Sequence, residues 1–116
     1  MTVCLVVEDE PLARRKICDL LRQTAWIDTI HETATLAAAR AVIKAHDVEL
    51  AFLDIQLPDG RSLSLLDDLS AGVKIVFTTA FDQYAVTAFE LQALDYLVKP
   101  FSEQRFKATL DRVQTA

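Results

Sequence analysis

Short apolar runs alternate with amphipathic stretches along the chain. Four of the runs have strand length, and each leads directly to side chains that can take part in chemistry: 3–7 leads to Glu8 and Asp9, 50–53 to Asp54, 75–77 to Thr78 and Thr79, and 96–98 to Lys99. A weaker alternation over 27–33 indicates a further strand. Strands that alternate with helices predict βαβ units around a parallel sheet.

The stretches between these runs carry apolar residues at helical spacing. They predict one helix from Pro11 to about Gln23 and a second from Leu36 to about His46. A third would contain Leu63, Leu66 and Leu69 and end at Gly72. Two more would follow caps at Asp82 and at Ser102. Five strands and five helices joined by short right-handed crossovers favour an α/β fold with a doubly wound parallel sheet. Ligands of such sheets bind beyond the carboxyl ends of the strands, where the reactive side chains fall.

Length and composition fit one domain, because 116 residues with 52% hydrophobic content suffice for a single core. The net charge of −5 disfavours direct binding of DNA, since an acidic surface repels phosphates. No apolar run approaches the roughly 20 residues that span a bilayer, so we expect a soluble cytoplasmic protein with no membrane partner. Cys4 and Cys18 lack the spacing of a zinc or redox motif and are predicted to be buried thiols.

Three carboxylates, a hydroxyl and an ammonium would meet at one edge of this sheet. Glu8, Asp9 and Asp54 would repel one another unless a hard cation accepted their oxygens, and Mg²⁺ suits a few carboxylates with water and phosphoryl oxygens. An ionised aspartate can attack phosphorus when a metal and a lysine neutralise the phosphoryl oxygens. Asp54 is the best nucleophile candidate because it stands alone at the tip of a strand predicted to be buried. Lys99 and Thr79 would complete the site.

These elements, in their order and spacing, resemble the receiver domains of bacterial two-component response regulators over essentially the whole chain. The resemblance rests on Val7-Glu8-Asp9-Glu10, Leu53-Asp54-Ile55-Gln56-Leu57-Pro58, Thr79-Ala80 and Tyr96-Leu97-Val98-Lys99-Pro100. It implies a flavodoxin-like receiver fold over residues 1–116, with strand order 2-1-3-4-5 and a cis Lys99–Pro100 bond. It also implies a signalling domain that is not an enzyme beyond its own phosphotransfer and dephosphorylation.

The resemblance also implies a role for each acid. Asp54 would be the phosphoacceptor that takes a phosphoryl group from a sensor histidine kinase. Asp9 and Asp54 would bind Mg²⁺ directly, Gln56 would supply a backbone carbonyl ligand, and Glu8 would act mainly through metal-bound water. Glu8 stands where Asp is commoner, and Ser62 where many receivers have Gly.

The resemblance implies that Thr79 and Tyr96 form the switch, with Lys99 acting on the phosphoryl group. Thr79 would move to hydrogen-bond the new phosphoryl group, Tyr96 would turn inward behind it, and Lys99 would pair with a phosphoryl oxygen. The stretch from Thr79 to Phe101 is similar to the LytTR-type (LytR/AlgR-like) subfamily, whose members carry a C-terminal DNA-binding domain.

No DNA-binding domain is present in residues 1–116, so we expect these residues to be the receiver part of a transcription factor, without its C-terminal DNA-binding domain. DNA would then be bound only through the missing domain, and a homodimer is one outcome of phosphorylation. A stand-alone receiver in a phosphorelay or motility pathway is the alternative.

Three other functions fit the residues less well. A phosphatase of the haloacid dehalogenase type needs a second acid two residues after its nucleophilic aspartate, where this chain has Gln56. A flavodoxin-like cofactor binder needs a hydroxyl- and glycine-rich phosphate loop, whereas the acids at 8–10 would repel phosphate. A degenerate receiver would lack the acid pair, the acceptor or the lysine. Taken singly, Asp54, Thr79 and Lys99 are also common as capping or surface residues.

Overall fold

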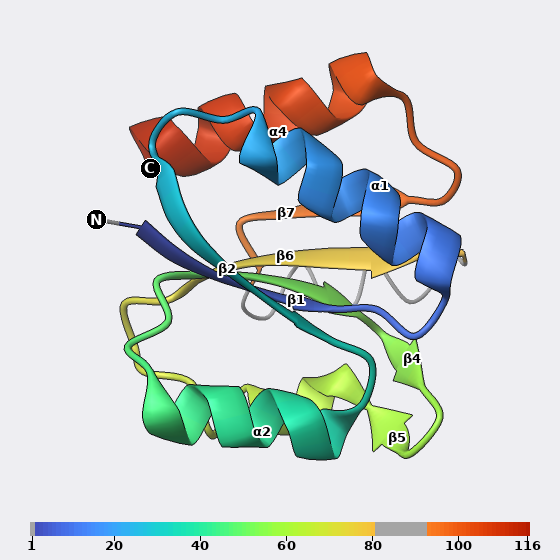
Figure 1. The fold of residues 1–116 in the computed structure, drawn as a ribbon, viewed down its shortest axis with the longest axis vertical. Helices are drawn as coiled ribbons and strands as arrows, with labels where there is room; N and C mark the ends of the chain where they lie inside the picture. Colours follow the sequence, from blue (N-terminus) through green and yellow to red (C-terminus); the bar gives the residue numbers. More distant parts are fainter. Residues whose placement is uncertain (1, 81–92) are drawn as a thin grey trace.

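A five-stranded parallel sheet forms the centre of the protein in the computed structural model, which describes residues 2–80 and 93–116. The strands are β1 (Thr2–Val7), β2 (Ile27–Thr33), β3 (Leu50–Asp54), β6 (Lys74–Thr79) and β7 (Asp95–Val98), arranged in the order β2-β1-β3-β6-β7. Figure 1 shows helices α1 (Pro11–Arg22) and α4 (Glu103–Thr115) over one face of the sheet and α2 (Leu36–Ala45) over the other. The predicted doubly wound sheet and its 2-1-3-4-5 order are therefore confirmed.

The central strands are apolar because helices cover both of their faces. Every residue of β3 is buried, and its side chains alternate between two cores. Phe52 belongs to the core beneath α1 and α4, where its ring lies 5.2 Å from that of Phe106. Leu53 belongs to the core beneath α2. Cys4 and Cys18 are buried free thiols in the first core, as predicted.

The helix boundaries follow from their caps. Glu10 accepts hydrogen bonds from the amides of Leu12 and Ala13 at the start of α1, and Ser102 caps α4 as predicted. Each cap satisfies first-turn N–H groups that have no partner within the helix. The predicted helix after Asp82 lies outside the described residues. None of the described helices is both long and apolar enough to cross a membrane.

The predicted α-helix through Leu63 and Leu69 is wrong. Residues 62–65 form a single 3₁₀ turn, η1 (Ser62–Leu65), and turns follow it. The leucines at 63, 66 and 69 recur every three residues, which suits a 3₁₀ helix, and the interspersed Ser and Asp residues compete for backbone hydrogen bonds. Gly72 consequently ends no α-helix.

A short hairpin, which the sequence pattern does not predict, follows β3. It pairs β4 (Gln56–Leu57) with β5 (Gly60–Arg61) around a turn at Pro58 and Asp59. Gly60 has a φ of 141°, a conformation that side-chain-bearing residues rarely adopt. The hairpin leads the chain away from the sheet edge toward α2 (Figure 1).

Candidate functional site

The reactive residues predicted from the strand ends do meet at one edge of the sheet. Glu8 and Asp9 follow β1, Asp54 ends β3, Thr79 ends β6, and Lys99 follows β7. Each of Glu8, Asp9 and Asp54 offers a carboxylate oxygen, and these atoms lie within 4.8 Å of one another. Glu8 and Asp54 are buried, whereas Asp9 is exposed.

Lys99 joins the two buried acids. Its Nζ lies 2.6 Å from Glu8 Oε1 and 3.1 Å from Asp54 Oδ2. The backbone supports this reach: the Lys99 N–H donates to the Thr79 carbonyl at 2.7 Å, and the Lys99–Pro100 bond is cis, as the resemblance implied. The lysine therefore crosses the end of β6 to reach the acids of β1 and β3.

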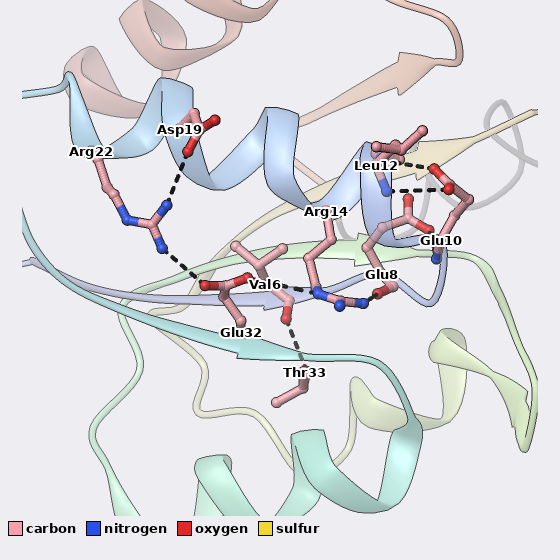
Figure 2. Close-up of polar contacts among 10 residues, drawn as sticks. Val6, Glu8, Glu10, Leu12, Arg14, Asp19, Arg22, Glu32 and Thr33 are labelled. Atoms are coloured by element: carbon pink, nitrogen blue, oxygen red, sulfur yellow. Dashed lines mark hydrogen bonds and ion pairs between the residues drawn. The ribbon is translucent and has the colours of Figure 1, made fainter.

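Glu8 is held on several sides. Its Oε2 accepts from the Glu10 N–H at 3.1 Å, and its backbone carbonyl accepts from the guanidinium of Arg14 at 2.9 Å. Figure 2 shows the Arg14 side chain between Glu8 and Glu32, its partner at 3.7 Å. Arg14 was not among the predicted site residues, because its contact is to a backbone oxygen that no motif identifies.

The charges at this edge do not balance. Burial, followed by the nearby Glu8, raises the pKa of Asp54 to about 7, although Lys99 lowers it. Burial would depress the pKa of Lys99, but its bond to Glu8 and the charge of Asp54 raise that pKa. One ammonium thus neutralises one of two buried carboxylates, and a divalent cation would relieve the repulsion that remains. The carboxylate donors at this edge fit Mg²⁺, which prefers oxygen ligands.

A small cavity adjoins the acceptor candidate. It has a volume of about 120 Å³ and is lined by Asp54, Gln56, Thr79, Ala80 and Lys99. A water molecule fills roughly 30 Å³ in the liquid, so the cavity has room for a group of several heavy atoms. Because a carboxylate and an ammonium both face it, the cavity suits a phosphoryl group that forms a bond to the former and a charge contact with the latter.

Tyr96 lies on β7, half-buried against the core beneath α2. Its backbone N–H donates to Asp95 at 2.8 Å, and its carbonyl accepts from Arg105 at 2.9 Å. The Asp95 carboxylate, itself buried, also binds Arg105, Thr109 and Arg112. Sequence analysis missed this cluster, because helix residues ten or more positions away supply most of it.

The Ser62 departure also has a visible consequence. The side chain is fully buried, and its hydroxyl has no hydrogen-bond partner within the described part of the chain. Its N–H donates to the carbonyl of Ile55 at 2.9 Å, so the segment after Asp54 folds back on itself. A glycine at this position would bury no such hydroxyl.

The family model described as "Response regulator receiver domain" matches residues 4–111. An uncharacterised response regulatory protein of Shewanella oneidensis is 42% identical over 98% of this chain and 49% of its own length. The sensory transduction protein LytT of Bacillus anthracis is 40% identical over 97% and 47%. The transcriptional regulatory protein LytR of Staphylococcus aureus is 34% identical over 95% and 46%. The chain thus spans about half the length of these relatives.

Among solved structures, the response regulatory domain of protein MrkE from Klebsiella pneumoniae is similar to this chain. The TM-score is 0.88 at 29% identity, and the match covers 98% of this chain and 96% of the other. The similarity extends over nearly the full length of each chain.

Proposed function

The chain belongs to the response regulator receiver domain family, and from that membership we propose that Asp54 accepts a phosphoryl group from a sensor histidine kinase. A receiver is a signalling domain, and membership implies a sensor kinase as its partner.

The observation that carries the proposal is the position of Lys99. Its ammonium contacts Asp54 and Glu8 at once and lines the same cavity as Asp54. An ammonium in this place offsets negative charge on phosphoryl oxygens as well as on the carboxylates. An ordinary surface lysine would not be directed at two buried acids.

In the proposed reaction, a carboxylate oxygen of Asp54 forms a bond to phosphorus while the bond from phosphorus to its donor breaks. The leaving group, an imidazole of the kinase or the carboxylate of a small donor, departs with the electron pair. Lys99 pairs with a phosphoryl oxygen, and Thr79, which lines the cavity, donates its hydroxyl to another. Ala80 has too short a side chain to obstruct the incoming group.

Asp9, Asp54 and the backbone carbonyl of Gln56 are the residues that would hold Mg²⁺, with Glu8 acting mainly through water. When bound, the ion supplies neutralising charge to the phosphoryl oxygens. The mutual proximity of the three carboxylates and the raised pKa of Asp54 support this assignment, since both reflect negative charge in need of a cation.

An apolar surface beside the site suits the kinase. Leu12, at the start of α1, is 73% exposed and is the one exposed large hydrophobic side chain among the described residues. It borders a cavity of about 440 Å³, which is also lined by Ala13, Lys16, Lys99, Pro100 and Phe101. A protein partner docked there would lie next to Lys99, which lines both this cavity and the cavity beside Asp54.

The proposed output is transcription, with Thr79 and Tyr96 as the switch. The name of the LytR relative, a transcriptional regulatory protein, supports this output, as does the fact that the LytR and LytT relatives are about twice as long as this chain. A DNA-binding domain outside residues 1–116, a homodimer formed on phosphorylation and a cytoplasmic location belong to the same proposal.

Incubation with acetyl phosphate, with Mg²⁺ in one arm and a chelator in the other, tests this function. Phosphoprotein detected on a phosphate-affinity gel only in the presence of Mg²⁺ is the expected result. Equal labelling in both arms would contradict the role assigned to the metal.

A further inference from the structure

Helix α2 is capped by a residue from the loop that follows Asp54. Asp59 Oδ1 accepts from the Leu36 N–H at 2.9 Å, and Oδ2 accepts from the Ala37 N–H at 3.2 Å. These first-turn amides have no partner within the helix itself. Thr35, the residue before the helix, accepts from the Ala38 N–H at 3.1 Å. The helix therefore has one cap of its own and one from a segment 23 positions away.

Packing and further polar contacts hold the same loop against α2. A Cβ on Gly60 would lie 2.9 Å from Leu36 Cδ1, so another residue there would have to displace the leucine as well as adopt a strained φ of 141°. Farther along the helix, Arg40 binds Asp68 at 3.1 Å and Ser64 at 3.0 Å. Figure 1 shows β4 and β5 beside one end of α2.

The other end of the loop is attached to the sheet. The N–H of Ile55 donates to the Thr78 carbonyl at 3.1 Å, and Gln56 pairs with Arg61 in the hairpin. Gln56 thus lies between two anchors, one at the end of β3 and β6 and one at the N-terminus of α2. Gln56 lines the cavity beside Asp54. The attachment of the loop to the N-terminus of α2 therefore influences where this part of the cavity wall lies.

We propose that Asp59 is a positioning residue of the phosphoryl and metal site, acting through its hydrogen bonds to α2, a helix that supplies no site residue. By capping α2, Asp59 fixes the loop that presents the Gln56 carbonyl, so the affinity for Mg²⁺ depends on these two hydrogen bonds. This inference rests on the proposed function, in which Gln56 is a metal ligand.

Three variants separate positioning from stability and from charge. Asp59→Ala removes the cap that comes from the loop. Thr35→Ala removes the neighbouring cap of the same helix and leaves the loop in place. Asp59→Asn removes the charge and keeps one side-chain oxygen, so it can retain one of the two hydrogen bonds. Titration calorimetry with MgCl₂ on each intact chain, with thermal melts in parallel, gives affinity and stability separately.

Asp59→Ala is expected to weaken Mg²⁺ binding about tenfold, as loss of a residue that orients a metal ligand commonly does. Thr35→Ala should lower the melting temperature about as much as Asp59→Ala does, because each variant removes a cap of α2. It should nevertheless keep the Mg²⁺ affinity within about twofold, because the Thr35 cap does not touch the loop. Asp59→Asn should weaken Mg²⁺ binding less than Asp59→Ala, because it keeps one of the two hydrogen bonds. Equal affinities for Asp59→Ala and Thr35→Ala would overturn the inference, and so would an equal loss in Asp59→Asn and Asp59→Ala.

Amide hydrogen exchange in the wild-type chain supplies a readout that needs no variant. Because coupling between two sites is reciprocal, Mg²⁺ should slow exchange at Leu36 and Ala37 more than at Ala38, which Thr35 caps. Unchanged exchange at Leu36 and Ala37 with saturating metal would overturn the inference while leaving the proposed function intact. A wild-type chain that binds no Mg²⁺ would overturn both.

Discussion

Lys99 Nζ lies 3.1 Å from Asp54 Oδ2 even though an intervening strand, β6, separates their two strands in the sheet. The long lysine side chain crosses that strand end and also reaches Glu8, which directly follows a third strand, β1. One cation is therefore shared between two buried carboxylates. This sharing leaves negative charge that a metal ion could neutralise. It also places the Lys99 ammonium where it could pair with the oxygens of a phosphoryl group.

Replacing Lys99 with Met should separate these two roles. Without the ammonium, no other cation competes with Mg²⁺ for the two buried acids, so the variant should bind Mg²⁺ more tightly than the wild type. Phosphorylation by acetyl phosphate should nevertheless slow by about 10²-fold, because a charge contact to the phosphoryl group is lost. Calorimetry and a phosphorylation time course measure the two effects. Lys44→Met, at an exposed position on α2, is the control and should change neither; weaker metal binding by Lys99→Met would contradict the account.

The raised pKa of Asp54 predicts a pH dependence of the metal-free protein. Folding raises this pKa from 3.8 to about 7, chiefly through burial, so between these values the folded state holds a proton that the unfolded state has lost. The free energy of unfolding should then fall as the pH rises from about 4 to about 8, on the order of 2 kcal/mol in all. Asp54→Asn removes this loss.

Urea melts of the wild type and of Asp54→Asn across this pH range, in a chelator, check the prediction. The variant should be the more stable of the two at pH 8 without metal. Addition of Mg²⁺ should restore the stability of the wild type. Saturating metal at roughly a hundred times its dissociation constant should add about 2.7 kcal/mol. If the free energy of unfolding had the same pH dependence in both proteins, burial of the ionised Asp54 carboxylate would not be destabilising.

Asp95 predicts the opposite pH dependence. Burial would raise its pKa, but hydrogen bonds from Arg105, Thr109 and the Tyr96 N–H together lower it. The stabilisation is thus complete above the ordinary value of 3.8 and is lost as the pH falls through the lower folded-state value. Asp95→Ala should cost about 2–4 kcal/mol at pH 7, because it leaves the partners of a buried carboxylate unpaired.

Denaturant melts at pH 7 and pH 3 test this second dependence, and the difference between wild type and Asp95→Ala should shrink at the lower pH. The matched control is Glu103→Gln, which breaks the exposed pair between Glu103 and Lys107 on α4. That pair should contribute only about 0.3–0.5 kcal/mol. A loss in the control as large as in Asp95→Ala would show that burial of the carboxylate is not what matters.

The exposed Leu12 provides a test of the kinase surface. Leu12→Ser should reduce phosphotransfer from a sensor kinase about tenfold, as expected for an apolar anchor at an interface. Labelling by acetyl phosphate should stay unchanged, because Leu12 lines no part of the cavity beside Asp54. Stability should also be retained, since the side chain is already exposed. Equal losses with the kinase and with acetyl phosphate would mean that the substitution acts on the site itself.

The strands and the strand-end residues could be predicted because each depends on local pattern. A run such as Leu50 to Leu53 is apolar throughout only where both faces of a strand are covered, and the residue after it then lies at the sheet edge. Lys99, Asp54 and Glu8 came together as predicted for this reason. Their roles in phosphorylation stay predictions.

Features that depend on distant partners could not be predicted. The Pro58–Asp59–Gly60 sequence indicates a turn, but nothing local shows that Asp59 caps a helix 23 positions earlier. The same holds for Arg105 and Asp95, which meet because α4 packs against β7. The error at Leu63 to Leu69 has a different cause, since a three-residue apolar period fits an α-helix and a 3₁₀ helix alike.

Intact-protein mass spectrometry after incubation with acetyl phosphate and Mg²⁺ tests the central claim most directly. The wild-type chain should gain the mass of one phosphoryl group, and Asp54→Asn, prepared and treated in the same way, should gain none. An unchanged wild-type mass, or a gain that persists in Asp54→Asn, would contradict the assignment of Asp54 as the phosphoacceptor.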